Sequence, residues 1–323
     1  MTYRRLGRNA LLAAAIICVV VLARLYLPGP WPWRHGPATQ PAVPGSGRFY
    51  AGVDSSHDGL AAYESAAGVT EPAIVGAYTN GHDGSVAGAL SLVSGLPGTI
   101  PLLSWGVDVT RGAVADGSQD TYLRAQAAAV AAYRKPVFLR LDWEMNGSWY
   151  PEWDGTSVSP SAYIAAWRHV WTIFQQAGAT NAAFVWCPNV SDLGGRSWTQ
   201  WYPGGEYVNW IGVDAYPDPT NSEAYVSGPG GLDAFAAFAK GEDKPAMLAE
   251  WAPGAPQQDP AATFDLVFSW LGRYPGTVKA LVYFNYQNTQ RDDLLVDDPA
   301  GAARYRQLLK QYRTGLYGTG GLR

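Results

Sequence analysis

The sequence predicts an α/β protein built as a (β/α)8 TIM barrel, and three observations lead to this prediction. Short apolar runs alternate with longer helical patterns along the folded part of the chain. Such alternation implies a parallel sheet, and eight repeats in about 270 residues match the usual size of a closed barrel. An open doubly wound sheet competes, but it would favour a glycine-rich phosphate loop after the first strand, and "AGVDSSHDG" has no such pattern.

Each predicted strand is a short apolar run that precedes a helix or a loop leading to one. The eight runs are "RFYAGVD" from Arg48, "AIVGAYTN" from Ala73, "TIPLLSWGVD" from Thr99, "KPVFLRLDWE" from Lys135, "AAFVWCPN" from Ala182, "NWIGVDAY" from Asn209, "PAMLAEW" from Pro245 and "VKALVYFNY" from Val278.

The clearest predicted helices begin at Thr121, Ser159, Gly231, Pro260 and Ala300. Ser159 followed by Pro160 is a favourable pair for an N-cap and a first turn, and Gly178 is placed to end that helix.

Residues 1–27 predict a signal peptide or a signal anchor. Three arginines among residues 4–8 precede an apolar run from Ala10 to Leu27 that only Arg24 interrupts, and this order is typical of export segments. Because Arg24 can snorkel, we favour an uncleaved anchor, with cleavage near Ala23 as the alternative. We therefore expect the rest of the chain outside the cytoplasm, anchored to the cytoplasmic membrane or secreted.

Residues 28–47, "PGPWPWRHGPATQPAVPGSG", predict an extended tether rich in Pro and Gly. The folded domain is then expected over residues 48–323, with membrane contact through the N-terminal segment only.

The composition argues against several classes of partner. With 23 Lys and Arg against 27 Asp and Glu, and no basic block beyond the N-terminus, the chain is not expected to bind nucleic acid. The four histidines show no metal-ligand spacing, so we expect no metal and no cofactor. Cys18 and Cys187 offer no disulfide framework. The 14 tryptophans suit flat apolar platforms for sugar rings, although a large core uses them too.

Polar and aromatic residues at the carboxyl ends of the strands are the candidates for function, because active sites of such barrels lie at that end. Glu144 ends the fourth run and Glu250 the seventh. One carboxyl that protonates a leaving oxygen and another that attacks the anomeric carbon are what glycoside hydrolysis needs. The other residues of this ring are Trp105, Trp186, Asn189, Asp214, Tyr216, Trp251, Tyr283, Asn285 and Tyr286.

Several segments, in order, carry a resemblance to a known family. "RLDWEMNGSWYP", "FVWCPN", "YPGGEYVNWIGVDAY" and "KPAMLAEWAPG" resemble the strand-end segments of glycoside hydrolase family 26, the β-mannanase and lichenase-type family of the retaining clan. The resemblance implies a TIM barrel in which Glu144 is the acid/base and Glu250 the nucleophile.

The resemblance also implies roles for the neighbours of these two residues. Tyr216 would orient Glu250, Trp149 and Trp186 would stack against sugar, and Arg140 and Asn146 would support the site. Two positions depart from the family's pattern. Trp143 stands where a histidine usually precedes the acid/base, and Glu152 interrupts the aromatic loop that follows.

The leading hypothesis is therefore a monomeric, exported glycosidase that cleaves internal bonds of a β-linked polysaccharide, such as mannan, β-glucan or an exopolysaccharide, by a retaining mechanism. The alternative is a surface glycan-binding or envelope polysaccharide assembly protein that has kept the barrel and lost turnover, for which Trp143 in place of histidine is the support.

Overall fold

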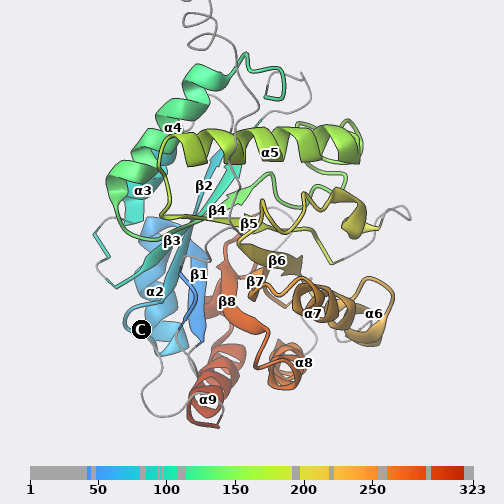
Figure 1. Cartoon of the computed structure of the whole chain (residues 1–323). Coiled ribbons are helices and arrows are strands. Elements are labelled where there is room, and N and C mark those ends of the chain that lie inside the picture. Colours follow the sequence, from blue (N-terminus) through green and yellow to red (C-terminus); the bar gives the residue numbers. More distant parts are fainter. Residues whose placement is uncertain are drawn as a thin grey trace, which may run out of the picture. The chain divides into compact units, whose positions relative to one another are not determined.

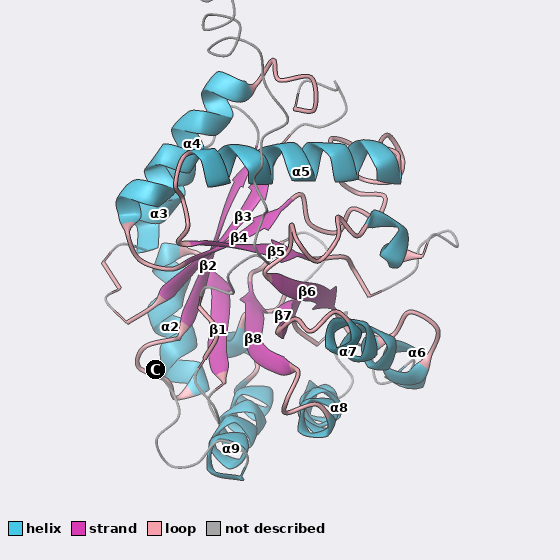
Figure 2. Cartoon of the chain, viewed as in Figure 1, coloured by secondary structure: helices cyan, strands magenta, loops and turns pink. Residues whose placement is uncertain are grey.

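The computed structural model contains a closed parallel barrel in which β1 to β8 pair in chain order and β8 pairs with β1. The structure describes residues 42–44, 49–80, 85–93, 95–96, 98–107, 114–190, 197–217, 222–253, 260–288 and 292–315. Figure 1 shows the strands at the centre with helices packed around them, and Figure 2 separates the two classes by colour. The predicted (β/α)8 fold is confirmed.

Every predicted strand coincides with a strand of the barrel. Their bounds are β1 (Tyr50–Ser55), β2 (Ile74–Asn80), β3 (Ile100–Gly106), β4 (Val137–Leu141), β5 (Ala182–Trp186), β6 (Trp210–Ala215), β7 (Ala246–Trp251) and β8 (Val278–Asn285).

The helices follow the strands as the barrel requires. The five helices that the sequence indicated most clearly are α4, α5, α7, α8 and α9. The helices are α2 (His57–Ala67), α3 (Val86–Val93), α4 (Asp120–Tyr133), α5 (Pro160–Gln176), α6 (Ser222–Ser227), α7 (Leu232–Gly241), α8 (Pro260–Arg273) and α9 (Pro299–Gly315), with short 3-10 turns η1 (Trp198–Trp201) and η2 (Leu295–Asp297).

Helix α5 begins and ends as its sequence predicts. The Ser159 hydroxyl accepts a hydrogen bond from the Ala162 N–H at 3.2 Å, Pro160 occupies the first turn, and Gly178 follows the helix with a φ of 70°. A positive φ suits glycine, which has no Cβ to clash. These caps fix where the chain leaves β4 and returns to β5, the strands that carry one side of the site.

The barrel interior is filled by large side chains at the amino ends of the strands. Phe138 of β4 and Trp210 of β6 are fully buried and meet edge to face, with ring centroids 5.1 Å apart. Gly212 lies above Trp210 on β6, and a Cβ there would come within 2.9 Å of Val185. This filled floor leaves polar groups only at the opposite, carboxyl end of the barrel.

The pairing between β6 and β7 shifts by one residue near the carboxyl ends of these strands. Val213 pairs with Leu248, but the next residue, Asp214, pairs with Glu250 instead of Ala249. A bulge of this kind changes which side chain faces inward. It brings the carboxylates of Asp214 and Glu250 to the same side of the sheet.

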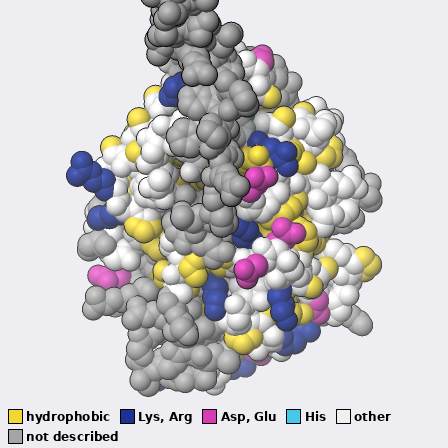
Figure 3. All heavy atoms as spheres, in the orientation of Figure 1, with side chains coloured by type: hydrophobic (Ala, Val, Ile, Leu, Met, Phe, Trp, Pro, Cys, Tyr) yellow, Lys and Arg dark blue, Asp and Glu magenta, His cyan; other side chains and the backbone are white. Residues whose placement is uncertain are grey.

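Figure 3 shows one face of the molecule, on which Lys and Arg side chains are distributed among uncharged side chains. Within the described residues, no helix combines the length and the apolar character needed to cross a membrane. The predicted anchor, Ala10 to Leu27, lies outside the described residues.

Candidate active site

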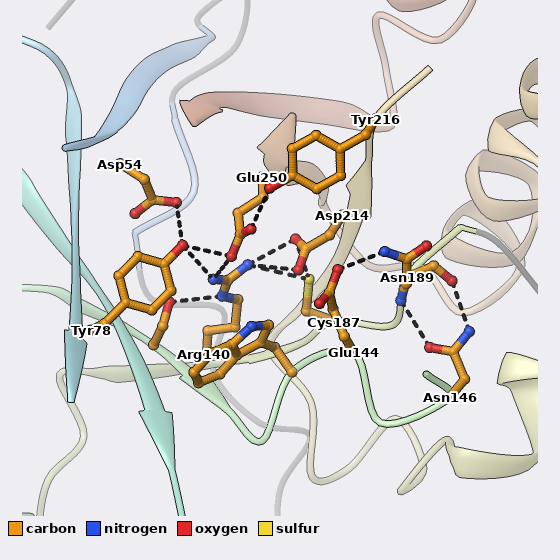
Figure 4. Close-up of polar contacts among 12 residues, drawn as sticks. Asp54, Tyr78, Arg140, Glu144, Asn146, Cys187, Asn189, Asp214, Tyr216 and Glu250 are labelled. Atoms are coloured by element: carbon orange, nitrogen blue, oxygen red, sulfur yellow. Dashed lines mark hydrogen bonds and ion pairs between the residues drawn. The ribbon is translucent and has the colours of Figure 1, made fainter. Parts of the chain in front are cut away.

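A buried guanidinium organises the polar end of the barrel. Arg140, on β4, has no exposed surface, and its Nη1 donates to both carboxylate oxygens of Asp214, at 2.8 and 2.9 Å. Its Nε donates to Ser104 Oγ at 2.9 Å, and its Nη2 forms an ion pair with Glu250 Oε1. One side chain therefore links β3, β4, β6 and β7 (Figure 4).

The side chain of Glu250 accepts from three donors. Besides Arg140, Tyr78 Oη donates to its Oε1 at 2.7 Å and Tyr216 Oη donates to its Oε2 at 2.7 Å. Only 5% of the residue is exposed. Donors and a cation favour the charged form of a carboxyl group, so the contacts suit a nucleophile, and Tyr216 makes the contact that the family resemblance implies.

Glu144 lies in a different environment, although it belongs to the same cluster. It is 6% exposed, and its carboxylate accepts hydrogen bonds from Trp149 Nε1 at 2.5 Å and from Asn189 Nδ2 at 2.6 Å. Both donors are neutral. Burial, and then the negative charge of Glu250, raise the pKa of Glu144 to about 7, against the opposing effect of the two hydrogen bonds and Arg140.

The backbone at the end of β4 is strained where it presents Glu144. Asp142 and Glu144 have φ values of 43° and 53°, in the left-handed region that side chains rarely adopt. Hydrogen bonds from both neighbouring strands hold this turn: the Asp142 N–H donates to Trp105 O at 3.1 Å, and the Glu144 N–H donates to Cys187 O at 2.8 Å. The Asp142 carboxylate also accepts from the Val107 N–H at 2.5 Å.

Asn146 supports the site through Asn189. Its side-chain amide donates to Asn189 O and accepts from Asn189 N–H, both at 2.9 Å, and it is fully buried. This reciprocal pair fixes the backbone of Asn189, so that the Asn189 amide points at Glu144 (Figure 4). Asn146 is therefore placed to position another residue and is covered from substrate.

Trp149 is the exposed aromatic residue beside Glu144, with 39% of its surface open. Its ring lies over Gly147, where a Cβ would come within 2.6 Å of the indole. The buried Asp154 carboxylate holds the following loop by accepting from the N–H groups of Tyr150 and Thr156, at 2.7 and 2.9 Å. Glycine thus permits the close approach, and the loop leaves the Trp149 ring exposed next to Glu144.

A cavity of about 290 Å³ lies between β1 and β2 and the helices α2 and α3, and it extends to Tyr286 beyond the end of β8. Tyr78 and Tyr286 stand in its wall, and Tyr78 is also the residue that donates to Glu250. This volume is close to the lower end of the range for small-molecule sites, roughly 300–1,000 Å³.

Three tryptophans that the sequence placed in the ring of candidates lie elsewhere. Trp105, Trp186 and Trp251 have no exposed surface. Trp105 packs on α4 and α5, Trp186 on η1 and α7, and Trp251 on α8 and α9. Side chains alternate along a strand, so these residues face the helices while their neighbours Ser104, Cys187 and Glu250 face inward.

Asn285 is also covered from substrate. It is 2% exposed, its amide nitrogen donates to Ser55 Oγ at 3.2 Å, and its oxygen accepts from the Leu295 N–H at 2.9 Å. These contacts tie the end of β8 to β1 and η2.

Asp54, Tyr78 and Cys187 belong to the cluster but were not among the predicted site residues. Asp54 and Tyr78 stand near the carboxyl ends of β1 and β2, where the same rule that selected Glu144 and Glu250 would have found them. The Cys187 thiol is buried and donates to Asp214 Oδ1 at 3.1 Å. Sequence alone offers no signal for that contact.

The two departures from the family's pattern occupy different surroundings. Trp143 is buried, and its ring stacks over the Arg140 guanidinium, with the centroid 5.2 Å from Cζ. A cation–π contact thus stands where a histidine is usual. Glu152 is exposed in the loop after Trp149.

No three His, Cys, Asp or Glu side chains in the described part of the chain are grouped as a metal site needs. His169 Nε2 lies 2.6 Å from Asp120 Oδ1, and His57 is the first residue of α2. His35 and His82 lie outside the described residues.

The fold and the site define a class: a (β/α)8 barrel with paired buried glutamates at the carboxyl ends of β4 and β7, the arrangement that the resemblance implies for a glycoside hydrolase. Residues 119–248 match the model of glycosyl hydrolase family 26. The match covers the segment that carries Glu144, and it confirms the resemblance seen in the sequence.

Two curated relatives match parts of the chain. Endoglucanase H of Acetivibrio thermocellus is 31% identical over 205 residues, which cover 61% of this chain and 22% of that protein. Mannan endo-1,4-beta-mannosidase A and B of Caldalkalibacillus mannanilyticus is 35% identical over 92 residues, covering 26% of this chain and 17% of that protein. The matches thus span only about a fifth of the relatives' length.

Solved structures share the fold at lower identity. A GH26 β-mannanase from Bacteroides ovatus superposes with a TM-score of 0.65 at 15% identity, covering 85% of this chain and 92% of that one. A modular endo-beta-1,4-mannanase from Cellulomonas fimi gives 0.62 at 21% identity, covering 79% and 70%. These superpositions support the barrel alone.

The raised pKa of Glu144 predicts a pH dependence of stability. Because the pKa is about 7 in the folded protein against an ordinary value of 4.5 for glutamate, the favourable contribution of this carboxyl is fully present below pH 4.5 and is lost as the pH rises through about 7. Glu144→Gln removes the titration. Its free energy of unfolding relative to wild type should rise by on the order of 2–3 kcal/mol between pH 5 and pH 9.

Denaturant unfolding at the two pH values measures this difference. Glu152→Gln, at an exposed glutamate, is the control and should change stability little at either pH. A Glu144→Gln effect equal at pH 5 and pH 9 would contradict the raised pKa.

Proposed function

We propose that this chain is a glycoside hydrolase that cleaves internal β-glycosidic bonds of a polysaccharide with retention of anomeric configuration. The observation that carries the proposal is the contrast between two glutamates of one cluster. Glu250 is held by a guanidinium and two tyrosines, whereas Glu144 is buried with neutral donors and has a pKa of about 7. When two carboxyl groups have environments that differ in this way, the difference indicates which one is the acid and which one is the nucleophile.

In the first step, protonated Glu144 gives its proton to the leaving glycosidic oxygen while the Glu250 carboxylate attacks the anomeric carbon. The bond between that carbon and the leaving oxygen breaks, and a covalent glycosyl ester forms on Glu250.

In the second step, Glu144 removes a proton from water, which displaces Glu250 from the anomeric carbon. The charge of Glu250 is the second-largest cause of the raised pKa of Glu144, and the ester removes that charge. The pKa of Glu144 therefore falls when the intermediate forms, which turns the acid into a base at the moment when a base is required.

We propose a β-linked glucan or mannan, or a related exopolysaccharide, as substrate. The names of the two curated relatives, an endoglucanase and a mannan endo-1,4-beta-mannosidase, support this class. The exposed Trp149 ring contacts Glu144, and Tyr78 in the cavity wall contacts Glu250, which suits a substrate of more than one sugar unit. Product analysis on a panel of β-glycans would identify the linkage.

We also propose that the domain acts outside the cytoplasm as a monomer, tethered by residues 1–27 as an anchor and residues 28–47 as a linker, or secreted after cleavage near Ala23. The basic flank and the apolar run from Ala10 support this location. Cell fractionation of the full chain, compared with a chain that begins at Arg48, tests it: only the full chain should be recovered outside the cytoplasm.

Substitution of either glutamate should abolish turnover. Glu250→Ala and Glu144→Gln are each expected to lower kcat by at least about 10³-fold, because each removes a group that forms or breaks a bond in the reaction. The assay is reducing-sugar release from whichever glycan of the panel wild type cleaves, and NMR of the first product should show the retained anomer. Full activity in both variants, or an inverted product, would contradict the roles assigned here.

Glu152→Gln is the matched control and should keep wild-type turnover. A wild type that binds a glycan without releasing product over long incubation would instead favour the alternative, a surface glycan-binding or assembly protein that has lost turnover.

The basic limb of the pH–activity profile should shift when a residue that donates a hydrogen bond to Glu144 is replaced. The Trp149 hydrogen bond favours the charged form of Glu144, so Trp149→Phe, which keeps an aromatic ring but removes the donor, should raise the pKa. The basic limb of kcat/KM is expected to move to higher pH by up to about one unit. Asn189→Ala should shift it in the same direction, and a limb that moves downward in both variants would show that other groups control it.

A further inference from the structure

Asp54, at the carboxyl end of β1, is a fully buried carboxyl group to which the two-glutamate mechanism gives no role. It reaches the catalytic cluster through Tyr78, whose Oη lies 3.4 Å from Asp54 Oδ2 (Figure 4). Its Oδ1 has no hydrogen-bond partner among the described residues.

The neighbouring strand leaves a niche for this carboxyl group. Gly76 pairs with Asp54 across β1 and β2, and a Cβ at residue 76 would lie 1.2 Å from Asp54 Oδ1. No other side chain can occupy position 76 while Asp54 keeps this place. The pair Asp54 and Gly76 therefore fixes a carboxyl group beside the tyrosine that contacts Glu250.

The single hydroxyl proton of Tyr78 determines the direction of its hydrogen bond with Asp54. Tyr78 has one hydroxyl proton, and the acceptor at 2.7 Å, Glu250 Oε1, is closer than Asp54 Oδ2 at 3.4 Å. The Tyr78 oxygen can also accept, and Arg140 Nη2 lies 3.3 Å from it. If Tyr78 donates to Glu250, a hydrogen bond between Asp54 and Tyr78 requires a proton on Asp54.

The charges around Asp54 agree with a neutral carboxyl group. Arg140 is the cation in the cluster, and it is already paired with Asp214 and Glu250. Burial raises the pKa of Asp54 well above its usual range; Arg140 opposes this shift, and the charge of Glu250 adds to it. Tyr286 and Tyr216 are neutral phenols of the same cluster, and burial is the main cause that raises the pKa of each.

We propose that Asp54 is a positioning residue that stays protonated and donates to Tyr78 Oη, which holds the Tyr78 hydroxyl as a donor to Glu250 Oε1. This inference rests on the proposed function. A neutral carboxylic acid adds a donor to the chain from Asp54 to Tyr78 to Glu250 without a further negative charge beside the nucleophile, and linked hydrogen bonds strengthen one another. An ionised Asp54 would instead compete with Glu250 for the Tyr78 proton.

Asp54→Asn and Asp54→Ala distinguish a protonated Asp54 from an ionised one. The asparagine amide keeps the shape, the neutral charge and a donor to Tyr78, so kcat/KM should stay within about threefold of wild type. Asp54→Ala and Tyr78→Phe each remove a donor from the chain to Glu250. We expect kcat of these two variants to fall about 10- to 100-fold.

Infrared spectroscopy tests the proton directly and needs no substrate. At pH 9, where Glu144 is largely ionised, the difference spectrum of wild type minus Asp54→Asn should contain the C=O stretch of a protonated carboxylic acid. Absence of that band, or an Asp54→Asn variant as impaired as Asp54→Ala, would overturn the inference. A wild type that shows the band but hydrolyses no glycan would instead overturn the proposed function.

Discussion

The ion pairs of Arg140 are the interaction on which the rest of the site depends. A guanidinium with no exposed surface is tolerated only where its charge and its donors are matched. Asp214 takes two of its hydrogen bonds, Ser104 a third, and Glu250 and Tyr78 accept from Nη2. Because Ser104, Asp214 and Glu250 stand on β3, β6 and β7, the closed barrel brings them around Arg140. The loss of Asp214 or Glu250 would leave part of the Arg140 charge uncompensated in the barrel.

The same guanidinium creates the difference between the two glutamates. Arg140 contacts Glu250 and is stacked against Trp143, while the contacts of Glu144 are to the neutral Trp149 and Asn189. Burial, and then the charge of Glu250, raise the pKa of Glu144, and on this ground we propose that Glu144 carries the proton. This assignment follows from contacts rather than from the likeness to other proteins, which supports the fold and the family.

Much of the fold was predictable because it depends on hydrophobic periodicity and turn residues, which can be read from short stretches of sequence. The eight apolar runs, the Ser159–Pro160 start of α5 and the positions of Glu144 and Glu250 at strand ends all follow from periodicity and turn chemistry. Fold class and candidate carboxylates could therefore be named before any contact was known.

The rest of the site depends on which face each side chain takes, and that depends on register. Trp186 and Trp251 were expected near substrate. Their neighbours Cys187 and Glu250 point into the barrel, so the two tryptophans point outward and pack against helices. The one-residue shift that pairs Asp214 with Glu250 and the niche at Gly76 that accommodates Asp54 are contacts between strands. No pattern within a single strand encodes them.

The central claim, that Glu250 forms a covalent bond to sugar, is tested most directly by trapping. The protein would be incubated with activated 2-deoxy-2-fluoro glucosides and mannosides and digested, and the labelled peptide would be located by mass spectrometry. The proposed mechanism predicts one equivalent of sugar on the peptide that contains Glu250, and none when Glu250 is replaced by alanine. A label on another residue, or a protein that hydrolyses glycan but is never labelled, would contradict it.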